Sequence, residues 1–562
     1  MGKRIKYNTT YYVIFTVAIG DDFIKSYIYN SNTQTHKIIK NQNTLTFLLE
    51  DLYTKTKSPE LTRIYCNKTT EKWINTFKNE ENYPLFSITS YDDILPNYTS
   101  WVPADYNDDY CIKKLYNVAN EIKFYVDKIG LKKFRKANED AGYGKIAVYC
   151  LEKDYPDLVN PKTVLDVIKR APSSKFIPTL KKLKKYGANC IISNEGNGAT
   201  FHNVVKLDID SSFSVVPILH KTMINLKFIK ADSYSVKDLC DLIVEGKKGF
   251  VVELKLNQQP SLKNYNYPDF IYKDFPEDVG IDNVSMKLGI KKVPTTITLT
   301  HLGFKNLLEI YNLNPKLIEI KKLLIGDLVD YLPFQKELLT RLHNDKSYYK
   351  EIGNILEKNK TKKTMHCLHG RGIMNMYDNI EVYRDKWKNK KQKFISPGDF
   401  IFNYIDSLMM YEYARDAILT IIRLCLYNKQ HTHYYDTDCV VIPNNPLTDL
   451  IIQEYNHYMI NQYQMKGYDV KDYTHYGHTI GLLEKEAVYD KFTYKQGKFY
   501  LYEIEGKLHS TTSGFPTDLI ANKLEEVTGL NGMEAYLAST NISLDLGWIY
   551  NSTTKSLGPL IF

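Results

Sequence analysis

Two carboxylates, Asp436 and Asp438, stand in the string Tyr-Tyr-Asp-Thr-Asp that begins at Tyr434. The string lies between β-branched and aromatic residues and a Pro-Asn-Asn-Pro turn, which predicts a strand. On a strand, side chains at positions i and i+2 point to the same face. Two such acids raise each other's pKa unless a cation lies between them. A pair of Mg²⁺ ions that handles a triphosphate needs such carboxylates, whereas an aspartate pair in a surface turn is the simpler alternative.

A second acidic strand comes much earlier in the chain, in Val-Val-Lys-Leu-Asp-Ile-Asp-Ser, where the aspartates are Asp208 and Asp210. Asp208 and Asp438 are so far apart in sequence that only the fold could bring them together. Taken alone, an aspartate at the end of a strand is more often a helix cap or a turn residue.

A stripe of cations and imidazoles is predicted on the proline-free segment 335–370, which we interpret as helix that ends at Gly370. Spacings of four, four and three residues place four side chains on one helix face. They are Lys358, Lys362, His366 and His369. Such lysines can neutralise the charge of a triphosphate, and one can protonate the departing pyrophosphate. A solvated basic face is the alternative for this helix alone.

The segment from Glu486 to Tyr500 ends in Lys498-Phe499-Tyr500. Strand spacing puts the lysine and the tyrosine on one face. There they could contact a phosphate and its sugar at the end of a primer, although this motif alone is weak.

Composition limits the class of protein that can carry these residues. The 562 residues exceed what one core can hold, and the net charge of +9 favours an anionic partner. No run of 18 apolar residues is present, so we expect no membrane span. The eight cysteines form no CxxC pair, which argues against a zinc site and fits a reducing cytoplasm. The apolar N-terminal stretch is interrupted by Thr16 and Asp21, so we interpret it as a strand and not as a signal peptide.

Taken in order, the chemical segments resemble family B DNA polymerases, in particular the protein-primed subgroup of phages and linear plasmids. Asp-Ile-Asp-Ser-Ser-Phe-Ser is similar to the first palm motif, and the segment from Lys360 to Gly370 contains a sequence similar to the fingers motif. Tyr-Tyr-Asp-Thr-Asp and Lys-Phe-Tyr match the Tyr-x-Asp-Thr-Asp and Lys-x-Tyr motifs. The resemblance implies an α/β (α+β) chain, with a right-hand polymerase of palm, fingers and thumb preceded by a ribonuclease-H-like exonuclease-type domain.

The resemblance also implies domain boundaries. They give an exonuclease-like domain (1–150), the first part of the palm (151–257), a first terminal-protein-region insertion (258–335), the fingers (336–371), a short second insertion (372–396), the second part of the palm (397–505) and the thumb (506–562).

Roles follow from the resemblance residue by residue. Asp208 and Asp438 are expected to bind the metals, Asp436 to tune that site, and Lys362 to be the main triphosphate lysine. The expected nucleotide-binding residues are Ser211, Phe213, Lys350, Lys358, His366 and His369. The expected primer- and DNA-binding residues are Lys498, Tyr500, Tyr434 and Thr437.

The chain departs from the family motifs in the nucleotide pocket. Histidines replace the fingers asparagine and tyrosine, at positions 366 and 369, and Phe213-Ser214 replaces the usual Tyr-Pro. Imidazoles can stack and form hydrogen bonds, so the pocket can still work. Phe213 occupies the position under the incoming sugar, where it could exclude a 2′-OH.

The N-terminal segment departs further. Relatives bind two metals there with four acids, the first two as Asp-x-Glu, but the first 25 residues contain only the adjacent acids Asp21 and Asp22. Asn67 matches the family, Glu71 replaces the third acid, and Lys114 stands where the last aspartate is expected. We therefore expect an exonuclease-like domain that has lost proofreading.

The expected reaction is template-directed addition of dNTPs with two Mg²⁺ ions, for which Mn²⁺ can substitute. Expected partners are template-primer DNA, dNTPs and a priming terminal protein, and the expected state is a monomer in the cytoplasm (of the host, if the protein is viral). Two alternatives stay open. One is a family B polymerase that uses an ordinary nucleic-acid primer, and the other is a non-catalytic polymerase-like DNA-binding protein.

Overall fold

The computed structural model describes most of the chain between residues 11 and 561. The described ranges are 11–19, 22–41, 44–45, 48–49, 63–68, 70–71, 74, 87–91, 95, 106–130, 133–134, 143–187, 199–264, 267, 295–373, 401–496, 499–512, 517–539, 542–551 and 556–561. The chain divides into two compact units, one of Met1–Asp154 with Leu508–Phe562 and one of Tyr155–Lys507. The predicted insertion 372–396 lies outside the described residues beyond 373.

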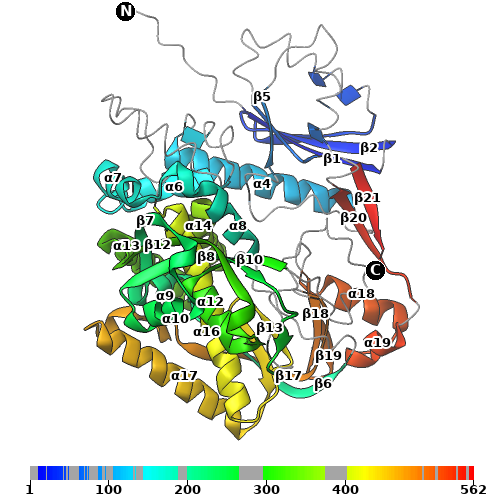
Figure 1. Cartoon of the computed structure of the whole chain (residues 1–562). Helices are drawn as coiled ribbons and strands as arrows, with labels where there is room; N and C mark the ends of the chain where they lie inside the picture. The colour runs from blue at the N-terminus through cyan, green and yellow to red at the C-terminus, as the bar shows by residue number, and fades with distance from the viewer. Residues whose placement is uncertain are drawn as a thin grey trace, which may run out of the picture. The chain divides into compact units, whose positions relative to one another are not determined.

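The first unit contains a mixed sheet in the order β3-β2-β1-β4-β5 (Figure 1). Strands β3, β2 and β1 are antiparallel, and β1, β4 and β5 are parallel. Alternating apolar residues bury one face of the sheet around Ile14, Ile28 and Ile64. Helix α4 packs on the sheet, and the Tyr11 hydroxyl donates to the Ala119 carbonyl at 3.2 Å. The elements are β1 (Tyr11–Ile19), β2 (Asp22–Asn30), β3 (Thr35–Ile39), β4 (Arg63–Cys66), β5 (Ser87–Ser90), α4 (Asp108–Ile129) and α6 (Tyr143–Asp154).

The C-terminal part of this unit, predicted as the thumb, contains short helices and a hairpin. Its elements are β19 (Lys507–Thr512), α18 (Leu519–Thr528), α19 (Gly532–Ala538), β20 (Asp545–Asn551) and β21 (Ser556–Ile561).

The second unit contains an antiparallel sheet in the order β10-β8-β12-β7. Its core lies between the sheet and helices α8 (Ile177–Gly187) and α16 (Tyr404–Tyr427). Leu180, Val251, Leu324 and Leu408 are fully buried there. Strands β7 (Lys221–Ile229) and β8 (Lys248–Leu256) precede position 257, whereas β10 (Thr295–Thr300) and β12 (Ile318–Asp330) belong to the predicted insertion. One sheet therefore spans the boundary expected at 257, and the domain boundaries stay a prediction.

A second antiparallel sheet of this unit positions the acidic segments. Within the unit its strands follow the order β13-β14-β6-β17-β18. The central strand β6 alternates buried and more exposed residues, as expected for a strand with one buried face. The strands are β6 (Phe201–Ile209), β13 (Tyr434–Asp436), β14 (Cys439–Pro443), β17 (Leu483–Gln496) and β18 (Phe499–Ile504).

The predicted fingers segment forms two helices, α13 (Pro333–Glu351) and α14 (Ile355–Ile373), that pack on each other. The prediction of continuous helix over 335–370 was therefore wrong. The chain breaks where Gly353 adopts a φ of 69°, a left-handed conformation that glycine tolerates and a helix does not. Helix α14 also continues past Gly370, which we expected to end it.

The remaining elements of the second unit connect these parts. They are α7 (Pro161–Arg170), η2 (Ser174–Phe176), α8 (Ile177–Gly187), α9 (Ser212–Leu219), η3 (Ala231–Ser233), α10 (Val236–Glu245), β9 (Ser261–Leu262), α12 (His301–Ile310), β11 (Tyr311–Asn312), η6 (Pro315–Leu317), α16 (Tyr404–Tyr427), α17 (Pro446–Met465), η9 (Val470–Tyr473), β15 (Thr474–His475) and β16 (His478–Thr479). Among the described helices, none combines the length and the apolar character that crossing a membrane requires.

Candidate active site

The fold brings Asp208 and Asp438 together. Asp208 pairs with Cys439 in the register of β6 and β14, and the Ile209 N–H donates to the Asp438 carbonyl at 2.9 Å. Both carboxylates line one cavity of about 340 Å³. The prediction that only the fold could join these two acids agrees with this geometry.

We had expected Asp436 and Asp438 to lie on one continuous strand, but the structure does not place them so. Strand β13 ends at Asp436, Thr437 adopts a φ of 56°, and the chain turns into β14. The rule that side chains two residues apart on a strand share a face does not apply here. Thr437, a left-handed residue in a two-residue turn, separates the two acids. Asp436 is buried and accepts hydrogen bonds from the Tyr434 hydroxyl at 3.2 Å and the Thr437 hydroxyl at 2.8 Å. It supports the turn that presents Asp438, and it does not line the cavity.

Burial dominates the electrostatics of the cavity acids, and repulsion between carboxylates adds to it. Burial and the neighbouring carboxylates of Asp438 and Glu486 raise the pKa of Asp208 to about 8. Burial likewise raises the pKa of Asp438 to about 6, although the ammonium groups of Lys362 and Lys206 oppose that shift. Acids held in this way favour a bound cation.

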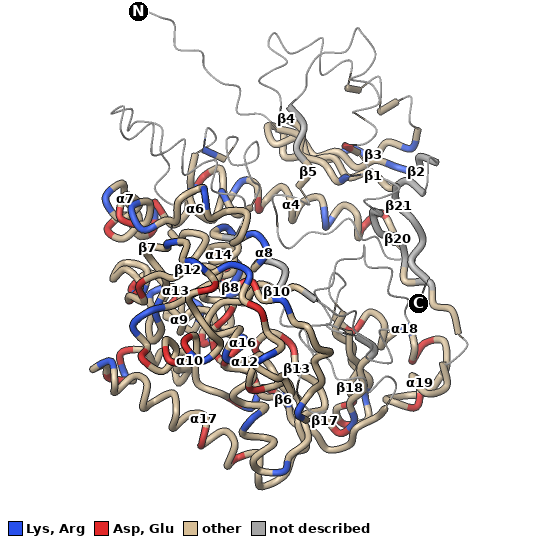
Figure 2. The backbone as a smooth tube through the Cα atoms, in the orientation of Figure 1, with Lys and Arg blue, Asp and Glu red and all other residues tan. Residues whose placement is uncertain are grey.

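Lysines from both fingers helices face these acids. Lys358 and Lys362 from α14 and Lys346 and Lys350 from α13 line the same cavity. Burial and the neighbouring ammonium groups lower the pKa of Lys358, as expected when like charges are crowded. The predicted stripe on α14 is confirmed by the cavity lining, which also includes His366 and His369. Figure 2 marks acidic and basic residues in the region of β6, β13 and β17.

Asp210 ties α13 to the palm strand. The Lys346 ammonium donates to Asp210 at 2.7 Å and to the Ser211 hydroxyl at 2.7 Å, and His343 Nε2 lies 2.9 Å from Asp210. Burial alone would raise the pKa of Asp210, but the hydrogen bond from His343 and the charge of Lys346 hold it well below its usual range. Ser211, which precedes α9, adopts a φ of 55°. We did not predict this cluster from the sequence.

A second chain of polar contacts joins α13 to the palm. Lys350 Nζ lies 3.0 Å from His478 Nε2, and His478 Nδ1 lies 3.2 Å from the Glu484 carboxylate. Asp210, His478 and Glu484 offer oxygen and nitrogen atoms within 4.8 Å of one another. Because Lys346 and Lys350 already contact two of the three residues, these side chains serve as a bridge between helix and strand.

Aromatic rings form one wall of the cavity. Phe213 stacks on His369 with ring centroids 4.5 Å apart and planes inclined by 14°, and the edge of Tyr411 meets Phe213 at 5.0 Å. Burial, helped by His366, lowers the pKa of His369 to about 3, so its ring is neutral. Phe213 and His369 therefore offer flat, uncharged surfaces beside the lysines.

Two of the expected primer-binding residues are buried inside the protein. Tyr434 and Tyr500 are both buried, with ring centroids 5.6 Å apart, in a cluster that includes Phe492. Their rings support β13 and β18 from within. Lys498 lies outside the described residues.

A buried lysine that we did not predict lies beside the acids. Lys206 on β6 makes an ion pair of 2.7 Å with Glu486 on β17. Burial alone would lower the pKa of Lys206, but Cys439, Tyr500 and Glu486 raise it above its ordinary value. The two-residue spacing of Glu484 and Glu486 on β17 was the available signal for Glu486, because it repeats the spacing of Asp208 and Asp210 at the end of β6.

Strand β1 of the first unit, where the first two exonuclease acids were expected, carries the neutral residue Thr16. Thr16 on β1 is fully buried; its N–H donates to Asn67 Oδ1 at 3.0 Å, and its carbonyl accepts from Asn67 Nδ2 at 2.7 Å. The Thr16 hydroxyl lies 2.7 Å from Ser26 Oγ and 2.6 Å from Thr70 Oγ1. The Lys114 ammonium lies over the Phe15 ring, 4.9 Å from its centroid. We call the four residues Thr16, Ser26, Asn67 and Thr70 the hydroxyl–amide network.

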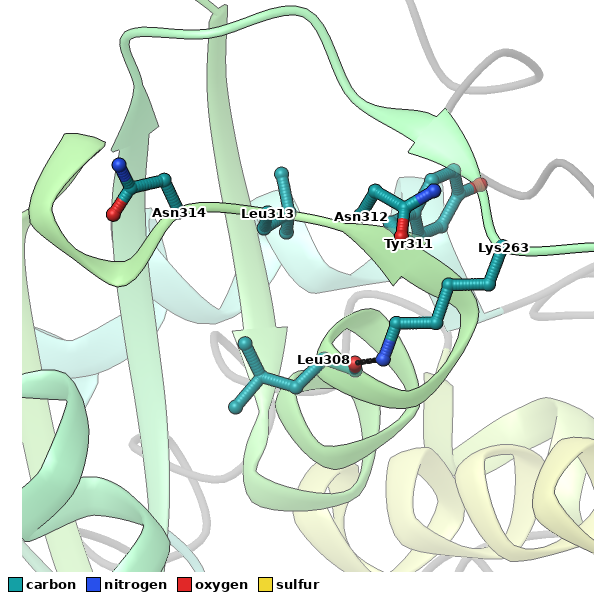
Figure 3. A pocket seen from close by; sticks show the side chains of 6 residues that line it. All are labelled: Lys263, Leu308, Tyr311, Asn312, Leu313 and Asn314. Carbon is teal, nitrogen blue, oxygen red and sulfur yellow. Dashed lines mark hydrogen bonds between the residues drawn. The ribbon is translucent and has the colours of Figure 1, made fainter.

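A second cavity, of about 370 Å³, lies beside the β9–β11 pair (Figure 3). Its one ammonium group, from Lys263, donates to the Leu308 carbonyl at 2.9 Å. The cavity is slightly larger than the acidic one, but it brings no carboxylate together with that lysine. We therefore choose the cavity of Asp208 and Asp438 as the candidate active site because of the residues that line it and not because of its size.

Sheet order, the paired fingers helices and the acids at the β6–β14 junction define the fold of a family B DNA polymerase. In particular, the chain is similar to solved structures of phi29 DNA polymerase. With the post-translocation complex on primer-template DNA, the TM-score is 0.57 and the identity 10%, over 99% of this chain and 100% of that chain. With the ternary complex that also contains incoming nucleotide, the values are 0.55 and 11%, over 98% of both chains. The predicted resemblance to protein-primed family B polymerases is confirmed at the level of fold.

Sequence comparison adds no relative. No family model matches the chain, and no curated protein matches it.

Proposed function

We propose that this protein is a DNA-directed DNA polymerase that adds dNTPs by two-metal phosphoryl transfer. The observation that carries the proposal is the meeting of Asp208 and Asp438 in one cavity with Lys362. The phi29 structures that share the fold hold primer-template DNA and incoming nucleotide, which supports DNA and dNTPs as the partners.

The donor set fits a pair of Mg²⁺ ions. Asp208 and Asp438 supply hard oxygen ligands, and their raised pKa values mean that a cation would relieve their repulsion. Mn²⁺ takes similar oxygen ligands and can substitute. When bound, such ions lower the pKa of an attacking hydroxyl and stabilise the charge on the transferring phosphate.

The other side chains of the cavity would bind the parts of the nucleotide. Lys362 and Lys358 would bind the triphosphate, and Lys362 can donate a proton to the departing pyrophosphate. Lys350 on α13 lines the same cavity, and its ammonium contacts His478. The stacked rings of Phe213 and His369 would offer a flat surface to the sugar and base of the nucleotide, and Ser211 lines the same cavity.

We also propose initiation on a priming terminal protein, to replicate a linear viral or plasmid genome. Support comes from the coverage of the phi29 fold, which extends over nearly the whole chain. The insertion predicted at 258–335 from the sequence agrees with this proposal. Primer extension assays with and without a small basic protein encoded next to this chain would separate protein priming from ordinary primers. Covalent labelling of that protein by a dNTP would support the proposal.

We further propose that the first unit has lost proofreading. The hydroxyl–amide network is neutral and satisfies its own hydrogen bonds, and a lysine, Lys114, replaces the last expected acid. Two metals cannot be held by such side chains. Incubation with Mg²⁺ and a mismatched primer, without nucleotides, tests this, because metal-dependent degradation from the 3′ end would contradict it.

The decisive experiment for the polymerase itself is primer extension by the wild type and by Asp438→Asn. Extension that survives this substitution would show that the assigned site is wrong. A non-catalytic DNA-binding protein, the second candidate, is favoured by the two fingers histidines, and it predicts DNA binding without any extension by the wild type.

A further inference from the structure

Lys206 is placed two residues before Asp208 on β6, on the same face of the strand. Its side chain is only 15% exposed, and its ammonium lies 2.7 Å from a Glu486 carboxylate oxygen. A buried lysine is uncommon and needs a partner, because an unpaired ammonium is costly to remove from water. Glu486 is that partner.

Glu486 acts on the catalytic acids as well as on the lysine. Its charge contributes to the electrostatics of both Asp208 and Asp438, and its side chain lines the same cavity while remaining half-exposed. Five carboxylates thus line one cavity; Asp210 contacts Lys346 and Glu484 contacts His478, and the other three are Asp208, Asp438 and Glu486. Carboxylates in such a set would ordinarily collect cations until their repulsion is relieved.

Lys206 also contacts the aromatic cluster that contains Tyr434, Phe492 and Tyr500. Its ammonium lies 6.0 Å from the centroid of the Tyr500 ring, a cation–π distance. Tyr500 and Tyr434 belong to that cluster, which supports both β18 and the turn that carries Asp438. The position of the ammonium is therefore fixed by the sheet and does not depend on a bound ligand.

We propose that Lys206 acts as a built-in cation that occupies the third carboxylate, Glu486, and so limits the site to the two metal ions of Asp208 and Asp438. The inference deepens the proposed two-metal polymerase function and rests on it. Lys206 is a positioning residue, because it acts on the ions through Glu486. A lysine suits this task because its ammonium is a compact point charge, as a bound metal ion is.

The test counts Mn²⁺ ions by electron paramagnetic resonance in a complex of the full chain with dideoxy-terminated primer-template and the complementary dNTP. We expect two ions with the wild type and with Glu486→Gln. Lys206→Met should gain a third ion, because Glu486 is then released, and the double variant Lys206→Met/Glu486→Gln should return to two.

A matched control exists in the same sheet. Lys491 on β17 makes an ion pair of 3.1 Å with Glu503 on β18, and neither residue lines the cavity. Lys491→Met should leave the count at two, which separates a loss of folding from a change in metal binding.

Two results would overturn the inference, namely a count of two for Lys206→Met or the loss of an ion in Glu486→Gln. They differ from failure of the proposed function itself. In that case the wild type would neither extend a primer nor bind Mn²⁺ in a nucleotide-dependent manner.

Discussion

The backbone N–H of Ile209 donates a hydrogen bond of 2.9 Å to the carbonyl oxygen of Asp438. This bond ties the end of β6 to the β13–β14 turn, so the carboxylates that flank it are fixed by main-chain atoms. The proposed metal site is thus positioned before any ligand arrives, which is what catalysis by positioned charge requires.

Asp438→Asn should lower the rate of primer extension by more than about a hundredfold, since even the loss of a residue that only orients a metal ligand costs 10–100-fold. Activity should be measured with circular dichroism as a check of folding. Asp166→Asn is the matched control, because Asp166 makes an exposed pair with Lys169 on α7, and neither residue lines the cavity. Equal losses in both variants would contradict the assignment.

Asp208 should make stability without metal fall as the pH rises. Its pKa of about 8 in the folded protein lies above the ordinary 3.8, so the folded state binds the proton more tightly and loses stability between these values. Asp208→Asn removes that loss. We expect its thermal midpoint to exceed that of the wild type at about pH 8.5, with a smaller difference at about pH 5. Excess Mg²⁺ should stabilise only the wild type, and a gain independent of pH would count against the shift.

Asp210→Ala should destabilise the second unit by about 3 kcal/mol, because it leaves the partly buried Lys346 without its carboxylate. Urea unfolding measures this change. Asp232→Ala is the control, since Asp232 pairs with Lys230 on an exposed surface and should cost less than about 1 kcal/mol. We also expect a higher KM for dNTP in Asp210→Ala, because α13 carries Lys350.

Phe213→Val should raise the use of ribonucleotides relative to deoxyribonucleotides by about tenfold or more, because it removes the ring from the wall of the cavity that we propose binds the nucleotide. Incorporation of matched rNTP and dNTP on one primer measures the ratio. Tyr411→Phe keeps the ring against Phe213 and should leave the ratio unchanged. A similar change in both variants would point to general loosening of the pocket.

Asn67→Ala should lower the stability of the first unit by about 1–3 kcal/mol, because it leaves the Thr16 N–H and carbonyl without partners. Limited proteolysis that follows fragments of the first unit would measure the loss. Primer extension at low temperature should be unaffected, and a stable Asn67→Ala variant would show that the network is not structural.

Sequence patterns predicted the parts of the site that lie within one element. The stripe from Lys358 to His369 follows from the period of a helix, and the strand around Asp208 follows from its apolar neighbours. The break at Gly353 was missed because the polar residues around it continue the helical pattern, and one glycine does not say on which side a helix must end.

Contacts between elements were not predictable in the same way. The pairs Lys206–Glu486 and Lys346–Asp210 depend on strand register and on the packing of α13, which a single sequence does not encode locally. The turn at Thr437 was missed because it lacks the Asn-Gly or Asp-Gly signal of a two-residue hairpin.

The hydroxyl–amide network has a consequence for the history of this protein. A single mutation that introduced an acid on β1, such as Thr16→Asp, would bury a charge among neutral groups, with no metal to balance it. Each step back toward a nuclease would thus weaken the fold before any activity returned. Under the proposed loss of proofreading, selection for accurate copying would therefore act more easily on the proposed nucleotide pocket than on this network.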